Sequence, residues 1–225
     1  VQQILMIEDD IKKRITHVVV MGIGEPFDNY DNLMRFIRII NNNKGIGIGS
    51  RHITVSTCGL IPGIDKFMEE DGQVNLAISL HAPNDRIRNE IMPISKVYKL
   101  DDLIDSIRRY IDKTNRRVTF EYILLDGVND MDDCAMELAK LLRGMNCYVN
   151  LIPYNETENI SFKRILRNLK TFFSNPANII LVIFAVILWL QMVNGTEQYH
   201  VISKLQRIRN TQFHKKSSTS MVIRI

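Results

Sequence analysis

Cysteine is scarce in this chain of 225 residues, and its placement excludes a secreted domain held together by disulfides. The three cysteines, Cys58, Cys134 and Cys147, are odd in number and far apart, which is not the pattern of a disulfide framework. The spacing between Cys134 and Cys147 has no paired Cys or His that would complete a zinc site. This use of cysteine predicts a reducing, cytoplasmic setting.

An excess of positive charge is absent from most of the chain. Residues 1–165 hold 21 Lys and Arg against 24 Asp and Glu, whereas residues 166–225 hold 8 against one acid. The formal net charge of +4 therefore comes from the tail, and it does not indicate a nucleic-acid groove in the rest of the chain. The N-terminus also lacks the basic segment and apolar core of a signal peptide, and we interpret it as an internal starting point.

No apolar run has the length of a membrane span. The longest, residues 179–190 (IILVIFAVILWL), has twelve residues, whereas a helix needs roughly 20 to cross a bilayer. A basic tail rich in Ser and Thr follows it and has little to bury. Membrane insertion, a core or interface helix, and a C-terminal region without a stable fold are all open interpretations, of which we favour the third.

Five apolar runs rich in β-branched residues alternate with helical patterns. The runs span residues 17–21, 53–57, 74–80, 117–125 and 148–154. The helical patterns span residues 31–40, 61–68, 85–92, 101–113 and 132–142. Continuous apolar strands that alternate with helices are typical of an α/β fold with a parallel sheet covered by helices.

Four of these runs end in clusters of small and polar residues. The clusters are GIGEP (22–26), STCG (56–59), SLHAPND (79–85) and PYN (153–155). The carboxyl ends of parallel strands share one edge of a sheet, where barrels of this class place their sites. The glycines of GIGEP permit positive φ, and Glu25 can accept hydrogen bonds from an ammonium group. A tight turn with a solvated Glu would explain this motif equally well.

The other candidate residues also have ordinary structural explanations when taken singly. Ser56 and Ser79 could contact a carboxylate or a ribose, or be turn formers and helix caps. His81 could be a ligand, a base or a satisfied core histidine, and Asn155 a turn residue. Four such clusters on successive strand ends are hard to explain by turn chemistry alone. The closely spaced glycines of residues 45–49 follow a helix, which excludes a dinucleotide fingerprint.

In sequence order these segments resemble motifs of the radical S-adenosylmethionine enzymes that methylate adenosine in RNA. The matching segments are MGIGEPFDNYDN, RHITVSTCGLIPGI, VNLAISLHAPNDRIRNEIMPI, RRVTFEYILLDGVND and VNLIPYN. The resemblance implies a partial (β/α)6 radical-SAM barrel that lacks its first strand, with an atypical tail. It divides the chain into residues 1–164, which hold strands two to six of the barrel, and residues 165–225, an unrelated or frame-shifted tail. We therefore expect the strand at 17–21 to lie at an open edge.

The resemblance also implies which positions contact S-adenosylmethionine. They are Gly24, Glu25, Ser56, Ser79, Leu80, His81 and Asn155. The first two would meet the amino group of the methionine part, Ser56 its carboxylate or the ribose, and residues 79–81 would lie along the adenosine. The activity implied is radical methylation at C2 of adenosine in 23S ribosomal RNA and transfer RNA, with C8 as the alternative seen in a near relative.

Two features of the family are missing from this sequence. The family holds a [4Fe–4S] cluster with a CxxxCxxC loop, and it carries a methyl-bearing cysteine near its C-terminus, but no cysteine here has that spacing or follows Cys147. We therefore expect the chain alone to be inactive. The alternatives are an inactive remnant that binds S-adenosylmethionine weakly, and a membrane-tethered interaction protein, which the short run at 179–190 disfavours.

Overall fold

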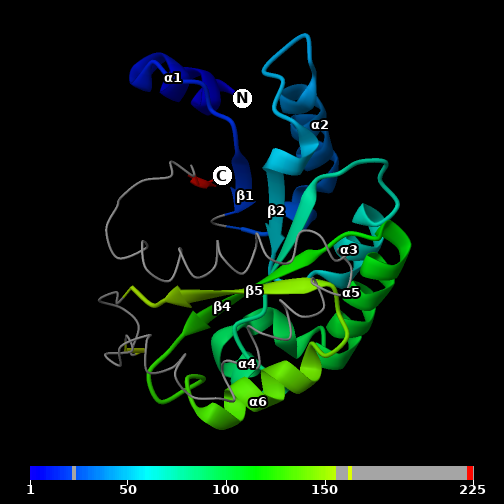
Figure 1. The fold of residues 1–225 in the computed structure, drawn as a ribbon, viewed down its shortest axis with the longest axis vertical. Coiled ribbons are helices and arrows are strands. Elements are labelled where there is room, and N and C mark those ends of the chain that lie inside the picture. The colour runs from blue at the N-terminus through cyan, green and yellow to red at the C-terminus, as the bar shows by residue number, and fades with distance from the viewer. Residues whose placement is uncertain (22–23, 156–161, 164–221, 225) are drawn as a thin grey trace, which may run out of the picture.

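The computed structural model describes residues 1–21, 24–155, 162–163 and 222–224. They form a parallel sheet with the strand order β5-β4-β3-β2-β1-β6. The strands are β1 (Val18–Met21), β2 (Ile53–Thr57), β3 (Asn75–Ser79), β4 (Val118–Leu124), β5 (Cys147–Pro153) and β6 (Val222–Arg224). The sheet is strongly twisted, so that β1 and β2 run upright in Figure 1 while β4 and β5 run across.

Helices follow each of the first four strands. They are α2 (Tyr30–Asn41), α3 (Ile61–Phe67), α4 (Asp85–Ile91), α5 (Leu100–Thr114) and α6 (Asp132–Leu141), with 3₁₀ turns at Pro26–Asn29, Ser50–His52 and Pro93–Lys96. The five predicted strands and five predicted helices are all present, each to within one residue at either end. The α/β fold expected from the alternation is confirmed.

The hydrophobic core lies between the sheet and these helices. Burial alternates along β4, where Val118, Phe120 and Tyr122 are buried and the residues between them are only partly covered. Successive side chains of a strand point to opposite faces, so the helices cover one face of the sheet. We call the other face, which carries Ser56, Ala77, Ser79 and Glu121 in β2, β3 and β4, the inner face.

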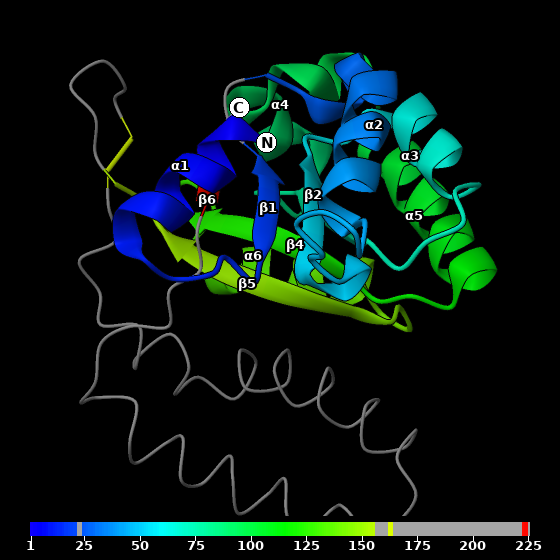
Figure 2. The same cartoon turned by 90° about the horizontal axis from the view of Figure 1, so that it is seen from above.

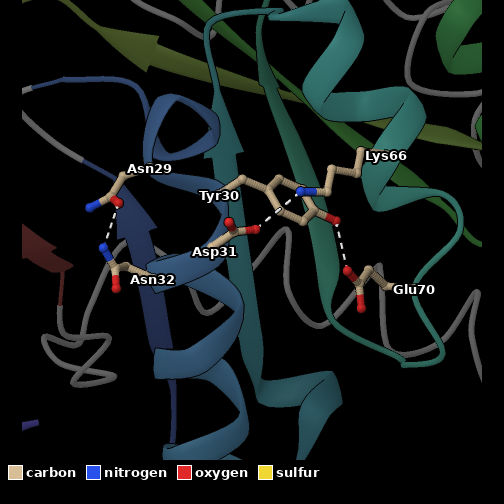
Figure 3. A network of polar contacts seen from close by, with 6 residues as sticks. All are labelled: Asn29, Tyr30, Asp31, Asn32, Lys66 and Glu70. Atoms are coloured by element: carbon tan, nitrogen blue, oxygen red, sulfur yellow. Dashed lines mark hydrogen bonds and ion pairs between the residues drawn. The ribbon is translucent and has the colours of Figure 1, made fainter.

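A polar network joins α2 to α3 at the surface (Figure 3). The Tyr30 hydroxyl donates to Glu70 at 3.1 Å, while Lys66 lies 4.0 Å from the centre of the Tyr30 ring and 3.1 Å from Asp31. Exposed ion pairs of this kind contribute little, typically about 1 kcal/mol or less. The network is of interest for its position next to Glu25. The helix α2 begins directly after the 3₁₀ turn at Pro26–Asn29, and Glu25 is the N-cap of that turn.

Two elements of the structure were not predicted. The helix α1 (Gln2–Ile11) lies on the far side of β1 from α2 (Figure 2). The expected open edge at β1 is wrong, because β6 pairs with β1 in parallel and sets Val222 beside Val19. The expectation was that the barrel's first strand is missing and that the edge of β1 is therefore open. The three-residue strand β6 occupies that edge instead.

Most of the tail, including the apolar run at 179–190, lies outside the described residues. Within the ranges that are described, no helix is both long and apolar enough to cross a membrane.

Candidate functional site

Glu25 links the ends of β1 and β2. Its Oε1 accepts a hydrogen bond from the backbone N–H of Phe27 at 3.1 Å, and its Oε2 accepts one from the N–H of Cys58 at 2.8 Å. A carboxylate offers about four acceptor positions, so two backbone donors fix its orientation and leave it able to accept from a cation. The preceding Gly24 has a φ of 100°, a conformation that favours glycine.

The loop after β2 is built around this carboxylate. Burial, followed by the hydrogen bond and charge of Glu25, raises the pKa of the Cys58 thiol to about 12. The thiol is therefore protonated at neutral pH, whereas nucleophiles and metal ligands require the thiolate. The Thr57 hydroxyl accepts from the N–H of Gly59 at 3.1 Å and closes the turn.

Ser56 and Ser79 lie on the inner face of the sheet. Ser56 of β2 pairs with Ala77 of β3. Ser79 lies two residues after Ala77 in β3 and pairs with Glu121 of β4. Ser56 is buried and Ser79 half-buried, and neither hydroxyl has a hydrogen-bond partner among the described residues. These two hydroxyls are available to a ligand on the inner face.

Residues 80 and 81 turn the chain away from β3. Leu80 is fully buried, and its N–H donates to the carbonyl of Glu121 at 3.0 Å. The ring of His81 accepts a hydrogen bond at Nδ1 from the N–H of Ile123, at 3.1 Å. Burial, together with the positive charge of Arg88, lowers the pKa of His81 to about 4. The ring is therefore neutral at physiological pH and carries its proton on Nε2.

Arg88, which the sequence did not single out, ties the ends of β2 and β3 together. This fully buried residue of α4 donates from Nη2 to the carbonyl of Cys58 at 2.8 Å and from Nε to the carbonyl of Leu80 at 3.3 Å. Its Nη1 is buried without a hydrogen-bond partner in the described part of the chain. Burial lowers its pKa. Arg88 thus fixes the two loops that carry the candidate residues.

The structure brings most of the predicted site together, with one exception. Residues 24–25, 56 and 79–81 lie on the adjacent strands β1, β2 and β3, at or just beyond their carboxyl ends. Asn155 is exposed and follows β5, which β4 separates from β3. The intervening strand carries Glu121 on the inner face, where its carboxylate accepts from Asn150 at 2.8 Å and burial raises its pKa.

The described residues do not fit an iron–sulfur cluster. They contain no group of three or more His, Cys, Asp or Glu that could hold a metal ion. Cys58 follows β2, Cys134 lies in α6 and Cys147 in β5. Burial raises the pKa of all three thiols, that of Cys147 to about 11. Protonated thiols on separate elements are not the thiolate set that such a cluster needs.

Comparisons with known proteins identify relatives of this chain. The sequence pattern of the radical SAM superfamily matches residues 1–142. A protein of Spiroplasma citri named "Probable dual-specificity RNA methyltransferase RlmN" is 57% identical over 175 residues, which are 76% of this chain and 51% of the relative. The protein of that name from Bacillus cytotoxicus is 57% identical over 71% of this chain and 44% of its own length. The chain thus spans about half the length of the curated relatives it matches.

Solved structures show the same relationship. A radical SAM methyltransferase from Sphaerobacter thermophilus superimposes with a TM-score of 0.73 at 46% identity, over 80% of this chain and 51% of the other. A domain of pyruvate-formate lyase-activating enzyme from Bacteroides vulgatus gives a TM-score of 0.55 at 17% identity, over 76% and 95%. The second likeness shows a shared fold alone.

Proposed function

The chain belongs to the radical SAM superfamily, and we propose that the ends of β1, β2 and β3 bind S-adenosylmethionine. The observation that carries this proposal is the carboxylate of Glu25, which two backbone N–H groups hold in place and which retains free acceptor positions for an ammonium group. The hydroxyls of Ser56 and Ser79, which have no hydrogen-bond partner in the described part of the chain, face the same side of the sheet. The open space beside Gly24, where an added Cβ would meet nothing within 4 Å, fits a ligand at this position.

Each part of the cofactor has a candidate partner. Glu25 would hold the amino group, and the preceding residue, Gly24, would allow the backbone to approach it closely. Ser56 would donate to the carboxylate or accept from the ribose, and residues 79–81 would lie along the adenosine. Asn155 is proposed as a further contact, although β4 separates its strand from the others.

The reaction we propose for the whole protein is methylation of C2 of adenosine in 23S ribosomal RNA and transfer RNA. The relatives named as dual-specificity RNA methyltransferases support this substrate class. S-Adenosylmethionine supplies the methyl group and the adenosyl group for radical chemistry when bound. The family also uses a [4Fe–4S] cluster, but the described residues do not fit that group, and we derive no step through it. This chain by itself is proposed to bind the cofactor without turnover.

We also propose that the chain has two parts and works in the cytoplasm. Residues 1–164 would form the cofactor-binding part of the barrel. Residues 165–225 would be a tail unrelated to it in sequence, although β6 of that tail pairs with β1. The change in composition supports a boundary near this point, because residues 166–225 hold 8 Lys and Arg against one acid. The free, protonated thiols support a reducing compartment.

Isothermal titration of the full chain with S-adenosylmethionine tests the proposal. Without an iron to chelate the methionine part, we expect binding no tighter than about micromolar, or roughly 8 kcal/mol. Glu25→Gln should raise the Kd about tenfold or more, because a hydrogen bond to a charged group contributes about 1.5–3 kcal/mol. Glu90→Gln, at an exposed position of α4, is the matched control and should leave the Kd unchanged.

A second ligand separates the proposed contact from a general loss of structure. 5′-Methylthioadenosine lacks the amino-acid part, so its Kd should be the same for Glu25→Gln and for the unaltered chain. An equal loss of affinity for both ligands would contradict the proposed role of Glu25. Absence of binding by the unaltered chain at millimolar S-adenosylmethionine would refute the function.

A further inference from the structure

His81 has an unusual backbone conformation that no helix end explains. Its φ is 58°, and Lys12 and Asn115 are the other two non-glycine residues with positive φ in the described ranges. Those two are the C-caps of α1 and α5, where left-handed residues are common. His81 instead lies just beyond β3. A non-glycine residue in this region is strained and persists only where its surroundings hold it.

The side chain of Asn129 supplies one of the restraints. This buried residue, 2% exposed, lies in the loop after β4. Its Nδ2 donates to the carbonyls of His81 and Ile123, both at 2.7 Å, and its Oδ1 accepts from the N–H of Leu125 at 2.8 Å. These partners fix the orientation of the side-chain amide, because exchanging its oxygen and nitrogen would place the oxygen against two carbonyl oxygens. Both Nδ2 hydrogens therefore have an acceptor.

The imidazole of His81 provides a second restraint. β3 ends at Ser79, so it offers no carbonyl to the backbone N–H of Ile123 in β4. Nδ1 of His81 accepts the hydrogen bond from that N–H instead, at 3.1 Å. The N–H of His81 donates to the carbonyl of Glu121 at 3.1 Å. With Asn129, three hydrogen bonds hold the backbone and the ring of this residue. Nε2 must carry the proton, and no described residue accepts it.

We propose that Asn129 is a positioning residue, which holds His81 at positive φ so that its ring presents Nε2–H as a fixed, neutral donor. The acceptor of this hydrogen bond would be an oxygen or nitrogen of the nucleoside part of S-adenosylmethionine, and this identification rests on the proposed function. The positioning of His81 by Asn129 does not depend on the proposed function. Asn129 acts through the backbone of its neighbour, and its own donors are already used within the protein.

Nitrogen-15 NMR of the imidazole rings in the full chain tests the positioning without any ligand. The unaltered protein should show His81 as the Nε2–H tautomer at pH 7. Asn129→Ala should give a mixture of the two tautomers, and Asn129→Ser, which retains one donor, an intermediate state. Ser106→Ala removes a partly buried hydrogen bond from α5 to Asp65 of α3, outside the loops of the candidate site. It is the control for general destabilisation and should leave the tautomer unchanged.

Ligand binding supplies the second readout. Asn129→Ala should raise the Kd for S-adenosylmethionine about tenfold, equivalent to roughly one hydrogen bond, while Ser106→Ala should leave it unchanged. In a His81→Gly background, where positive φ costs nothing and the ring is absent, Asn129→Ala should change the Kd by less than about twofold.

The two readouts distinguish the possible failures. If the unaltered chain does not bind S-adenosylmethionine, the proposed function fails while the NMR result still decides the positioning. Should Asn129→Ala not fold, Asn129→Ser and the tautomer of the unaltered protein carry the test. An Nδ1–H tautomer or a charged ring in the unaltered protein at pH 7, or an unchanged tautomer in the folded Asn129 variants, would overturn the inference.

Discussion

Replacing the buried guanidinium of Arg88 perturbs the link between the ends of β2 and β3. Arg88→Met keeps much of the side-chain volume but removes the donors to the carbonyls of Cys58 and Leu80, which lie 2.8 Å and 3.3 Å away. Each buried carbonyl left without a partner costs about 1–3 kcal/mol. The loss is partly offset because a buried charge, whose Nη1 has no partner among the described residues, no longer has to be desolvated.

We therefore expect Arg88→Met to lower the free energy of unfolding by about 2–4 kcal/mol. At about 2–4 °C per kcal/mol for a domain of this size, the Tm should fall by roughly 4–16 °C. Thermal unfolding of the full chain followed by circular dichroism measures it. Arg86→Met, at an exposed position of the same helix, should change the Tm by no more than about 2 °C.

The outcome separates two physical accounts of this residue. If Arg88→Met is as stable as the unaltered chain, the two carbonyls must find other partners, and the reasoning that makes the guanidinium the link between the loops is refuted. A loss as large in Arg86→Met would also contradict it, because the effect would then belong to the helix and not to the buried contacts.

Three further predictions follow from single contacts in the structure. Gly63→Ala would place a Cβ 2.5 Å from the Cβ of Phe27, and such overpacking should cost about 1–3 kcal/mol in urea unfolding, whereas Gly72→Ala, where nothing lies within 4 Å, should not destabilise the chain. Cys58, with its pKa raised to about 12, should resist iodoacetamide at pH 7.5 in the folded chain and react after unfolding in urea; alkylation at the rate of a free thiol would contradict its protonated state. Because the pKa of His81 is lowered to about 4 in the folded chain, its contribution to stability is present above the ordinary value of about 6.5 and is lost as the pH falls through 4. The acid-induced loss should be smaller in His81→Asn, and an identical pH profile would count against a buried neutral ring.

The strands and helices were predictable because their signal is local. The apolar run at residues 53–57 coincides with β2, and α2 to α6 follow the spacing of apolar residues on one helical face. The positions of Glu25, Ser56 and Ser79 were also predictable, since residues that follow parallel strands gather at one edge of the sheet. The strand ends alone could not identify the ligand, and S-adenosylmethionine was inferred from the resemblance to a known family.

The buried polar links were not predictable from local sequence. Arg88 lies in a polar stretch that reads as a solvated helix, and its burial arises from contacts 30 residues away at Cys58. Asn129 reads as a turn residue, yet it bonds His81 across 48 residues. Hydrogen bonds between residues so far apart in the sequence produce no periodic pattern or characteristic spacing from which they could be predicted.

Two elements were missed for a different reason. The helix at Gln2–Ile11 has no side-chain N-cap, no acid in its first turn and no basic residue in its last, so the usual start and stop signals are absent. The strand at Val222–Arg224 has three residues, too few for a pattern. An unpaired edge strand can pair with another extended segment, and β1 does so here.

The central claim, that the ends of β1 to β3 bind S-adenosylmethionine, is tested most directly by mapping the binding surface. Titration of the nitrogen-15-labelled full chain with the cofactor, followed by backbone amide NMR, identifies the residues it approaches. We predict the largest shifts at Gly24, at the Cys58 amide bonded to Glu25, and at residues 79–81, with little change in α1. Shifts confined to other parts of the chain, or none at millimolar cofactor, would contradict this account.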